Sequence, residues 1–341
     1  MAEWVWEDGI GETRAALIED GRIIRAEIER PFSGPRVGTT TRARFGASLV
    51  GRHSIVVKLE GGREAVIDTP PRQIGPGSGV TVEIVREEIF GPRRYKRPKA
   101  AIISDDERIG DGPALLDRIA GECVPLRRIR PIDPDLLEQA GWSELIEEAR
   151  TGRVAFPGGS LLIELTEAMT LIDVDGTLDP VSLAIAGARA AAEAISRLRI
   201  GGSIGIDLPT LGDRAGRKAA AEAFDAAMRV PFERTAVNGW GFLQVVAPRP
   251  RASLLELIRG DEPLAEALLL YRRAEREPPP GDIVIRANTD VMTTMGREQN
   301  DAILASRAGA PVHWNVRPFI SRWSGTAYRI GYDASDEGGE D

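Results

Sequence analysis

The 341-residue chain contains very little cysteine or histidine, and this limits the chemistry available to it. Cys123 is its one cysteine, which excludes an internal disulfide and any metal cluster held by several thiolates. His53 and His313 are its two histidines. A histidine pair could act as acid and base only within one site. The two fall in separate expected domains, which favours surface or structural roles.

Long apolar segments and familiar catalytic motifs are also missing. No apolar run approaches the roughly 20 residues that a membrane-spanning helix needs. The first eight residues lack the basic start and apolar stretch of a signal peptide. GxSxG elbows, Walker A loops and zinc-ligand spacings do not occur. The missing apolar segment and signal peptide, together with the single cysteine, predict a cytoplasmic protein without a membrane partner.

An overall excess of basic residues is lacking too, since the formal net charge is −8. This sum is unfavourable for a nucleic-acid-binding protein, because phosphate contacts need lysine and arginine. The acidic, glycine-containing tail at 333–341 is expected to be disordered. Basic residues are instead concentrated in one run, formed by Arg93, Arg94, Lys96, Arg97 and Lys99. The run could contact phosphates or be a solvated loop of mixed charge.

Hydrophobic periodicity and turn residues predict a multidomain α/β (α+β) protein, because the chain is too long for one typical core. The expected parts run in this order along the chain: an N-terminal hairpin packed on the core (1–36), a small OB-type β-barrel (37–100), a connecting region (101–157), a mixed α/β core (158–277), a small α/β domain (278–332) and the acidic tail (333–341).

Turn signals place the strands of the first two parts. Asp20-Gly21 separates two strand-like segments, Glu12–Glu19 and Arg22–Glu29, and predicts a hairpin. Four or five short strands between Val37 and Phe90 suit a small barrel. Barrels of the OB type commonly bind single-stranded nucleic acid, although this composition fits any small barrel.

Three longer segments have helical character. An amphipathic helix is expected over Leu136–Arg150, helical structure over Ser253–Glu277 and a further helix over Thr289–Arg307. Prolines 278–280 predict a stiff linker before the last domain. In that domain we expect strands at Ile283–Ala287, Val312–Val316 and Ala327–Gly331.

The most informative stretch contains two strands joined by a helix. The strands are expected at Met169–Val174 and Ser203–Leu208. Asp179-Pro180 provides an N-cap and a first-turn proline for the helix, and Gly201-Gly202 ends it. If the strands are parallel, this is a βαβ unit whose strands often lie side by side.

Aspartates end both strands of this unit. Asp173 and Asp207 then lie at the same edge of the sheet, where ligand sites of α/β sheets collect. Asp175 shares a strand face with Asp173, because side chains alternate along a strand. Three converging carboxylates would repel one another, and a divalent cation such as Mg²⁺ would offset that repulsion. The alternative is that these aspartates only favour the turns that follow.

Several ordered segments resemble the ribonuclease E/G family. GGSLLIELTEAMTLIDVDG (158–176) is similar to the signature in which a glycine-led strand enters a TEALT-type turn and an "ID-x-N" strand end. GGSIGID (201–207) is similar to the second signature, and an alanine-rich helix ending in SRLR (196–199) lies between them. GETRAALIEDGR (11–22) resembles the family's N-terminus. The resemblance extends over most of residues 10–250.

The resemblance implies a magnesium-dependent endoribonuclease that acts on single-stranded RNA in processing or decay. It implies that Asp173 and Asp207 hold Mg²⁺, with Mn²⁺ as an alternative ion. Asp175 stands where the family usually has asparagine, so it could add a ligand or perturb the site. Residues 37–90 would be the family's S1-type barrel. Arg214, Arg217 and Lys218 open the helix after Asp207, where a phosphate or plain solvent suits them equally.

Other departures from the family's pattern narrow the expectations. The barrel segments Ser54–Leu59 and Glu64–Asp68 contain no aromatic residue for base stacking, which contributes about 1–3 kcal/mol per base. Trp240, Trp314 and Trp323 could stack on bases, although tryptophans more often pack in a core. The segment before Gly158 is short, so we expect little sensing of a 5′-monophosphate. Zinc-link cysteines are missing, so a monomer or zinc-free homodimer is expected. A non-catalytic RNA-binding protein on the same scaffold is the alternative function.

Overall fold

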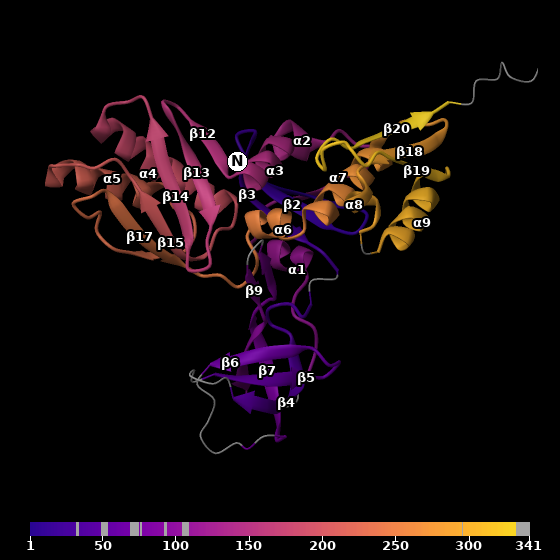
Figure 1. Cartoon of the computed structure of the whole chain (residues 1–341), viewed down its shortest axis with the longest axis horizontal. Helices are drawn as coiled ribbons and strands as arrows, with labels where there is room; N and C mark the ends of the chain where they lie inside the picture. The colour runs from indigo at the N-terminus through magenta and orange to yellow at the C-terminus, as the bar shows by residue number, and fades with distance from the viewer. Residues whose placement is uncertain are drawn as a thin grey trace, which may run out of the picture.

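A computed structural model describes residues 1–31, 34–48, 54–68, 75, 77–91, 94–103, 109–294 and 296–331. Figure 1 shows a six-stranded sheet with its helices on the left, a small α/β domain on the right and a barrel below them. The N-terminal sheet lies between these parts. The mixed α/β class expected from the sequence is confirmed, with several sheets and separate helices.

The N-terminal sheet contains the expected hairpin and two strands that were not expected. β2 (Thr13–Glu19) and β3 (Arg22–Glu29) pair antiparallel. Asp20 and Gly21 between them both have positive φ, as a tight I′ turn requires. β1 (Glu3–Asp8) precedes them, and β11 (Leu126–Arg128) pairs parallel with β1. The segment after the barrel therefore returns to this sheet.

A carboxylate in this sheet is surrounded by guanidinium groups. Glu27 lies 2.8 Å from Arg25, 3.0 Å from Arg118 and 3.6 Å from Arg199, and its side chain is 6% exposed. Burial alone would raise the pKa of Glu27, but Arg199, Arg25 and Arg118 outweigh burial and lower that pKa to about 2. Because Arg118 comes from α1 (Leu115–Ala120), this cluster ties the helix to β3.

The second part is a closed barrel whose strands run in the order β10-β6-β5-β4-β7. Small and branched apolar side chains fill it, including Phe45, Val57 and Ile84. The five strands have these bounds: β4 Thr40–Ser48, β5 Ser54–Leu59, β6 Glu64–Asp68, β7 Gly79–Arg86 and β10 Lys99–Ile103.

Both ends of the barrel segment lie close together. Thr40 forms an isolated bridge with Gly110. The Gly112 N–H donates to the Thr39 hydroxyl at 2.9 Å, and Arg36 donates to the Gly112 carbonyl at 3.1 Å. The barrel is thus an insertion between β3 and α1 whose entry and exit are hydrogen-bonded to each other.

A two-stranded hairpin leaves the barrel between β7 and β10. It consists of β8 (Ile89–Gly91) and β9 (Arg94–Lys96), and it packs against α6 (Leu254–Gly260). A Cβ on Gly260 would lie 2.5 Å from the Phe90 carbonyl, so glycine permits this close approach. The hairpin therefore links the barrel to the rest of the chain. The sequence analysis missed it.

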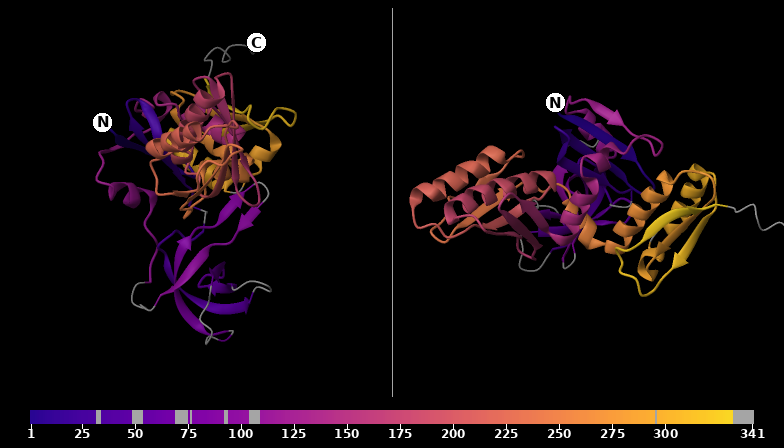
Figure 2. Two further views of the ribbon diagram at one scale, coloured as in Figure 1. Left: turned by 90° about the vertical axis from the view of Figure 1, so that its left-hand side faces the viewer. Right: turned by 90° about the horizontal axis from the view of Figure 1, so that it is seen from above.

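The six-stranded sheet has helices on one face only (Figure 2). Its strand order is β12-β13-β14-β15-β17-β16, and α4 (Pro180–Arg197) and α5 (Arg214–Ala227) cover one side. The bounds of the strands are β12 Arg153–Phe156, β13 Gly159–Leu165, β14 Thr170–Gly176, β15 Gly202–Asp207, β16 Glu233–Arg234 and β17 Phe242–Ala247. The strands expected at Met169–Val174 and Ser203–Leu208 are present as β14 and β15, whereas β12, β16 and β17 were missed. Since β12 belongs to this sheet, the sheet begins before residue 158.

Three expected helices are each interrupted, and each break has a local cause. Leu136–Arg150 is split into α2 (Leu136–Gln139) and α3 (Trp142–Thr151), because Gly141 adopts a φ of +94°. Ser253–Glu277 is split into α6 and α7 (Glu262–Arg276), because Asp261 leaves the helical conformation and caps α7. Thr289–Arg307 is split before Gly296, which also has positive φ, into α8 and α9: Thr289–Met292 and Arg297–Ala308.

The C-terminal sheet has the order β19-β18-β20, and its expected strands are present. Helix α7 shares a core with this sheet, since Leu268 and Tyr271 pack with Ile283 and Ile285. The bounds are β18 Asp282–Ala287, β19 Val312–Val316 and β20 Thr326–Ile330.

Glu266 on α7 is a buried carboxylate near this domain. Its side chain accepts a hydrogen bond from the Gly325 N–H at 3.1 Å, and the residue is 2% exposed. Burial raises the pKa of Glu266 to about 7, although Arg273 and Arg150 oppose that rise.

Candidate functional site

The two strand-end aspartates face each other on the sheet. β14 and β15 run parallel, and Asp173 is the register partner of Asp207. Both residues are exposed and lie on the open face of the sheet, opposite α4 and α5. The expected βαβ unit is therefore present, and it places two carboxylates side by side in solvent.

Alternation of apolar and polar residues fixes this orientation. Ile172 and Val174 of β14 point into the core together with Ile204 and Ile206 of β15. Helix α4 comes very close to them: a Cβ on Gly187 would lie 2.3 Å from Val174. A one-residue slip of β14 would bury Asp173 and expose the isoleucine, so the hydrophobic face determines the register.

Asp175 does not complete a three-carboxylate site. It is exposed on the same strand face as Asp173, and its Oδ1 accepts from the Gly176 N–H at 2.8 Å. Across the described ranges, no group of three or more histidine, cysteine, aspartate or glutamate side chains is arranged to hold a metal ion. Asp173, Asp207 and Asp175 do not form such a group, and a metal site on Asp173 and Asp207 stays a prediction.

An exposed tryptophan lies at the same end of the sheet. Phe242, the first residue of β17, is the register partner of Asp207, and Trp240 precedes it by two residues with 79% exposure. The Asn238 side chain accepts from the N–H groups of Trp240 and Phe242 at 2.9 and 3.0 Å. The turn is thus rigidly held, and it presents an indole ring to solvent close to the aspartates.

The other two tryptophans proposed for stacking have structural roles. Trp314 packs against the C-terminal core and donates to Asp301 at 3.0 Å. Trp323 packs against the main core beneath the guanidinium of Arg150. Only exposure, which the sequence does not reveal, distinguishes Trp240 from these two.

The basic run between residues 93 and 99 lies on the hairpin and at the start of β10. Lys96 ends β9, Arg97 pairs with Glu64 at 3.0 Å, and Lys99 pairs with Asp68 at 2.5 Å. Arg93 and the side chain of Arg94 lie outside the described residues. The described part of the run is therefore spread between the hairpin and the barrel.

Two of the cationic residues at the start of the helix after Asp207 contact neighbouring residues of the same segment. Arg214 begins α5, and Arg217 donates to the carbonyls of Leu211 and Gly212 at 2.7 and 3.2 Å. Lys218 pairs with Glu222 one turn further on. Helix α5 packs against α4, away from the hairpin and barrel that carry Lys96 and Lys99 (Figure 1).

The described structure covers one of the two histidines. His313 lies on β19 and forms a 3.0 Å contact with Asp282, while His53 lies outside the described residues. Where the structure describes the chain, no helix is long and apolar enough to cross a membrane.

The sequence analysis also missed two aromatic residues on the hairpin. Phe90 and Tyr95 are register partners with ring centroids 5.2 Å apart, and they are 54% and 52% exposed. The Tyr95 hydroxyl donates to Glu88. Burial and Glu88 raise the pKa of Tyr95 to about 12, so the phenol stays neutral. The signal available in the sequence was the alternation along this short strand: Ile89 points inward, so its neighbour Phe90 points outward.

Comparison with known proteins identifies the segment that carries the aspartates. Residues 94–247 match the model of the Ribonuclease E/G family, and the match includes both Asp173 and Asp207. No curated protein matches the chain. This match points to endoribonuclease activity on RNA. Over residues 94–247, the chain is similar to the ribonuclease E/G family.

Proposed function

We propose that the chain is a metal-dependent endoribonuclease that hydrolyses phosphodiester bonds of single-stranded RNA in cytoplasmic RNA processing or decay. One observation carries this proposal: Asp173 and Asp207 are in register on adjacent parallel strands, exposed, and within the segment that matches the family. No salt bridge involving either aspartate occurs among the described residues. Their charge is therefore available to a ligand.

The donor set fits magnesium. Mg²⁺ is usually held by one or two carboxylates together with water and substrate oxygens, whereas Ca²⁺ prefers six to eight oxygen ligands. Asp173 and Asp207 would hold Mg²⁺ or Mn²⁺. A bound ion there supplies orientation of the attacking water and charge stabilisation during hydrolysis.

The chain's own side chains would do the remaining work. Asp173 and Asp207 hold two negative charges at the open edge, and their strands keep the carboxylates in register. Asp175, tied to the Gly176 N–H, adds negative potential beside them without sharing their position. Trp240 offers a face on which a base next to the cleaved bond can stack.

RNA binding would begin on the barrel and hairpin. We assign the closed five-stranded barrel to the S1 or OB type, which suits single-stranded RNA. Aromatic residues are missing from β5 and β6, so stacking shifts to Phe90 and Tyr95 on the hairpin. Arg97 and Lys99 would contact phosphates beside them.

The decisive test is cleavage of an unstructured RNA over a magnesium series. Cleavage should require Mg²⁺, stop with EDTA and be lost in Asp173→Asn and Asp207→Asn. Asp20→Asn is a matched control, because Asp20 is exposed in a distant turn whose positive φ asparagine tolerates. Undiminished cleavage by both site variants would exclude this mechanism. RNA binding without cleavage at any magnesium concentration would favour a non-catalytic RNA-binding protein.

Assembly is a further part of the proposal. We expect a monomer or a zinc-free homodimer, because paired thiolates for a zinc bridge are missing and Cys123 is single and exposed. Light scattering should give the same mass with and without a strong zinc chelator. A tetramer that dissociates on chelation would contradict this expectation.

A further inference from the structure

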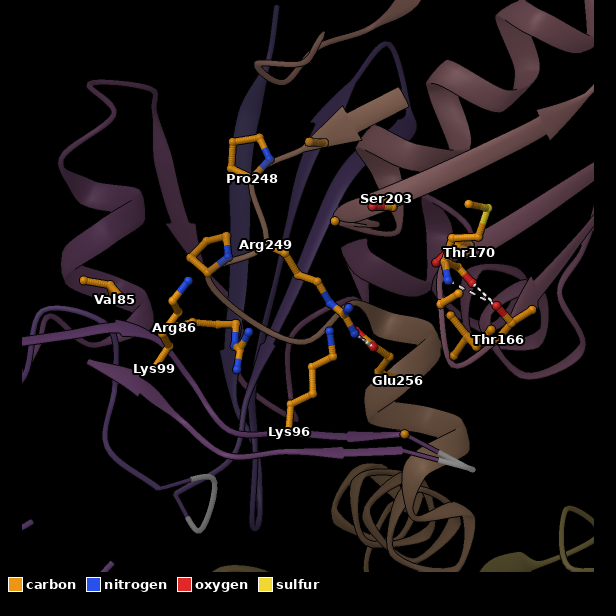
Figure 3. Close-up of a pocket in the computed structure, with 17 residues that line it drawn as sticks. Val85, Arg86, Lys96, Lys99, Thr166, Thr170, Ser203, Pro248, Arg249 and Glu256 are labelled. Atoms are coloured by element: carbon orange, nitrogen blue, oxygen red, sulfur yellow. Dashed lines mark hydrogen bonds and ion pairs between the residues drawn. The ribbon is translucent and has the colours of Figure 1, made fainter. Parts of the chain in front are cut away.

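A cavity of about 500 Å³ lies where the hairpin and barrel meet the six-stranded sheet (Figure 3). Arg86, Lys96 and Lys99 line it from the barrel side, and Arg249 enters it from the segment after β17. The carboxylate among its lining residues is that of Glu256. Four cationic side chains thus surround the cavity with one acid.

The charge of Glu256 is already engaged. Its side chain accepts from the Ser253 N–H and hydroxyl, each at 3.0 Å, and it forms an ion pair with Arg249. Those contacts form the capping box of α6. Lys99 is also paired, with Asp68 at 2.5 Å. Four cations nevertheless converge on one partly enclosed space, where an anion would offset their mutual repulsion.

Lysine is rare in this chain, and its distribution is uneven. The sequence contains four lysines, and two of them, Lys96 and Lys99, line this cavity. Lysine presents a compact point charge that suits phosphate, whereas arginine offers a planar fork of donors. Lys96 and Arg249 extend into the cavity from opposite elements in Figure 3.

The strands that carry the two family signatures run from this cavity to the aspartates. The TEAMT turn contributes Thr166 and Thr170 to the lining, and the second signature contributes Gly202 and Ser203. The Thr166 hydroxyl donates to the Met169 carbonyl at 2.7 Å, which fixes the turn. A strand rises about 3.3 Å per residue, so Asp173 and Asp207 lie roughly 10–13 Å from the cavity.

Between the cavity and the two aspartates, the surface of the sheet is formed by small and apolar residues. Gly205 lies midway between Ser203 and Asp207, and a Cβ there would lie 2.5 Å from the Phe242 ring. Leu171 beside it is 37% exposed. A single strand could therefore lie across this face with its bases against Leu171 and Phe242.

We propose that this cavity binds a phosphate of the RNA chain a few nucleotides away from the bond at Asp173 and Asp207. The proposal rests on the proposed function and assigns a second anchoring site to it. Lys96, Lys99 and Arg249 hold the phosphate, and the strands of the two signatures set its spacing from the cleavage site. The cavity has no base preference, because its cationic side chains contact the phosphate and not the base.

Amine acetylation at low reagent concentration tests this directly, because four lysines are easily followed by mass spectrometry. The full chain is labelled in EDTA with and without an unlabelled single-stranded oligonucleotide. Lys96 and Lys99 should be protected at least about threefold, while Lys218 on α5 reports general effects. Equal labelling of Lys96 and Lys99 with and without bound RNA would overturn the proposal, as would equal protection of all four lysines.

Variants provide a second, quantitative test by fluorescence anisotropy in EDTA. Lys96→Ala together with Lys99→Ala should weaken oligonucleotide binding about tenfold. The slope of log affinity against log salt should fall by about 1 for each phosphate contact removed. Lys96→Arg should recover most of the Lys96→Ala loss. Arg22→Ala, which removes one exposed charge at the distant hairpin turn, should change neither quantity. An unchanged salt slope in the double variant would overturn the proposal.

Two further experiments distinguish RNA binding in this cavity from the alternative explanations. Asp173→Asn should abolish cleavage and leave the protection of Lys96 and Lys99 intact, so failure of the metal site and failure of the cavity are distinguishable. Inorganic phosphate and AMP serve as free ligands. If either protects both lysines at lower concentration than the oligonucleotide does, the cavity binds a free small anion and the assignment to RNA is wrong.

Discussion

The open face of the six-stranded sheet and the N-terminal sheet use acidic residues in opposite ways. Glu27 in the N-terminal sheet is buried among three arginines, and its pKa is lowered to about 2. Asp173 and Asp207 stand side by side in solvent. A carboxylate whose partners all come from the protein contributes to stability, whereas one left next to a like charge is available to a cation. Replacing Glu27 should therefore lower stability, whereas replacing Asp173 or Asp207 should lower RNA cleavage.

The largest expected effect is on catalysis. Asp173→Asn or Asp207→Asn should lower RNA cleavage by more than about a hundredfold, since changing even the groups that orient metal ligands costs about 10–100-fold. Stability should change by no more than about 0.5 kcal/mol, because both residues are exposed. Cleavage rates and urea denaturation of the same preparations check both parts. A large loss of stability would show that this pair is structural.

The reverse pattern is expected for Glu27→Gln. Removing one partner of a buried ionic cluster should cost about 3–5 kcal/mol at pH 7. Because the folded-state pKa is depressed from 4.5 to about 2, this stability is present above pH 4.5 and is lost as the pH falls towards 2. Urea denaturation between pH 7 and pH 3 should show the two proteins converging. Glu3→Gln, which breaks an exposed pair with Arg127, should cost less than about 1 kcal/mol.

A third experiment concerns the aromatic group at the open face. Trp240→Ala should weaken RNA binding by about 1–3 kcal/mol, because a base would lose its stacking surface. Trp240→Phe should retain most of the affinity, and neither change should alter stability much at a residue 79% exposed. Oligonucleotide titration in EDTA measures the binding. Equal affinity of the wild type and the alanine variant would remove Trp240 from the proposed RNA path.

The last experiment tests Glu266, a buried acid whose burial is less offset by arginines than that of Glu27. The pKa of Glu266 is raised from 4.5 to about 7, so folding favours its protonated form. Its contribution is fully present below pH 4.5 and declines as the pH rises to 7. Glu266→Gln keeps an acceptor for Gly325 and should raise stability by about 1–3 kcal/mol at pH 8, with little change at pH 5. Destabilisation at pH 8 would mean that ionised Glu266 is well compensated.

The paired aspartates were predictable from the sequence because their geometry is local. Alternation along Met169–Val174 and Ser203–Leu208 gave the strands, and the helix between them made the strands parallel neighbours. The Asp20-Gly21 turn gave the first hairpin in the same way. In each case, short-range pattern and tertiary structure agree.

Other features depend on contacts that sequence periodicity does not encode. Single residues, such as Gly141 and Asp261, break helices whose apolar pattern continues across the break. β11 pairs with β1 across more than a hundred residues. The basic cavity combines residues from the barrel, the hairpin, two strands and the segment after β17, so its charge is invisible in any one segment.

Because the two ends of the barrel segment lie next to each other, this part of the chain is a self-contained insertion. Because Thr40 bridges Gly110 and Arg36 reaches Gly112, the backbone leaves and re-enters the N-terminal sheet at nearly one point. A short turn could join these two points at little cost in loop-closure entropy, with loss of the contact between the hairpin and α6. The β14–β15 aspartates lie outside this segment. The architecture therefore allows the barrel and the strands that carry the aspartates to be exchanged or to evolve separately within one polypeptide.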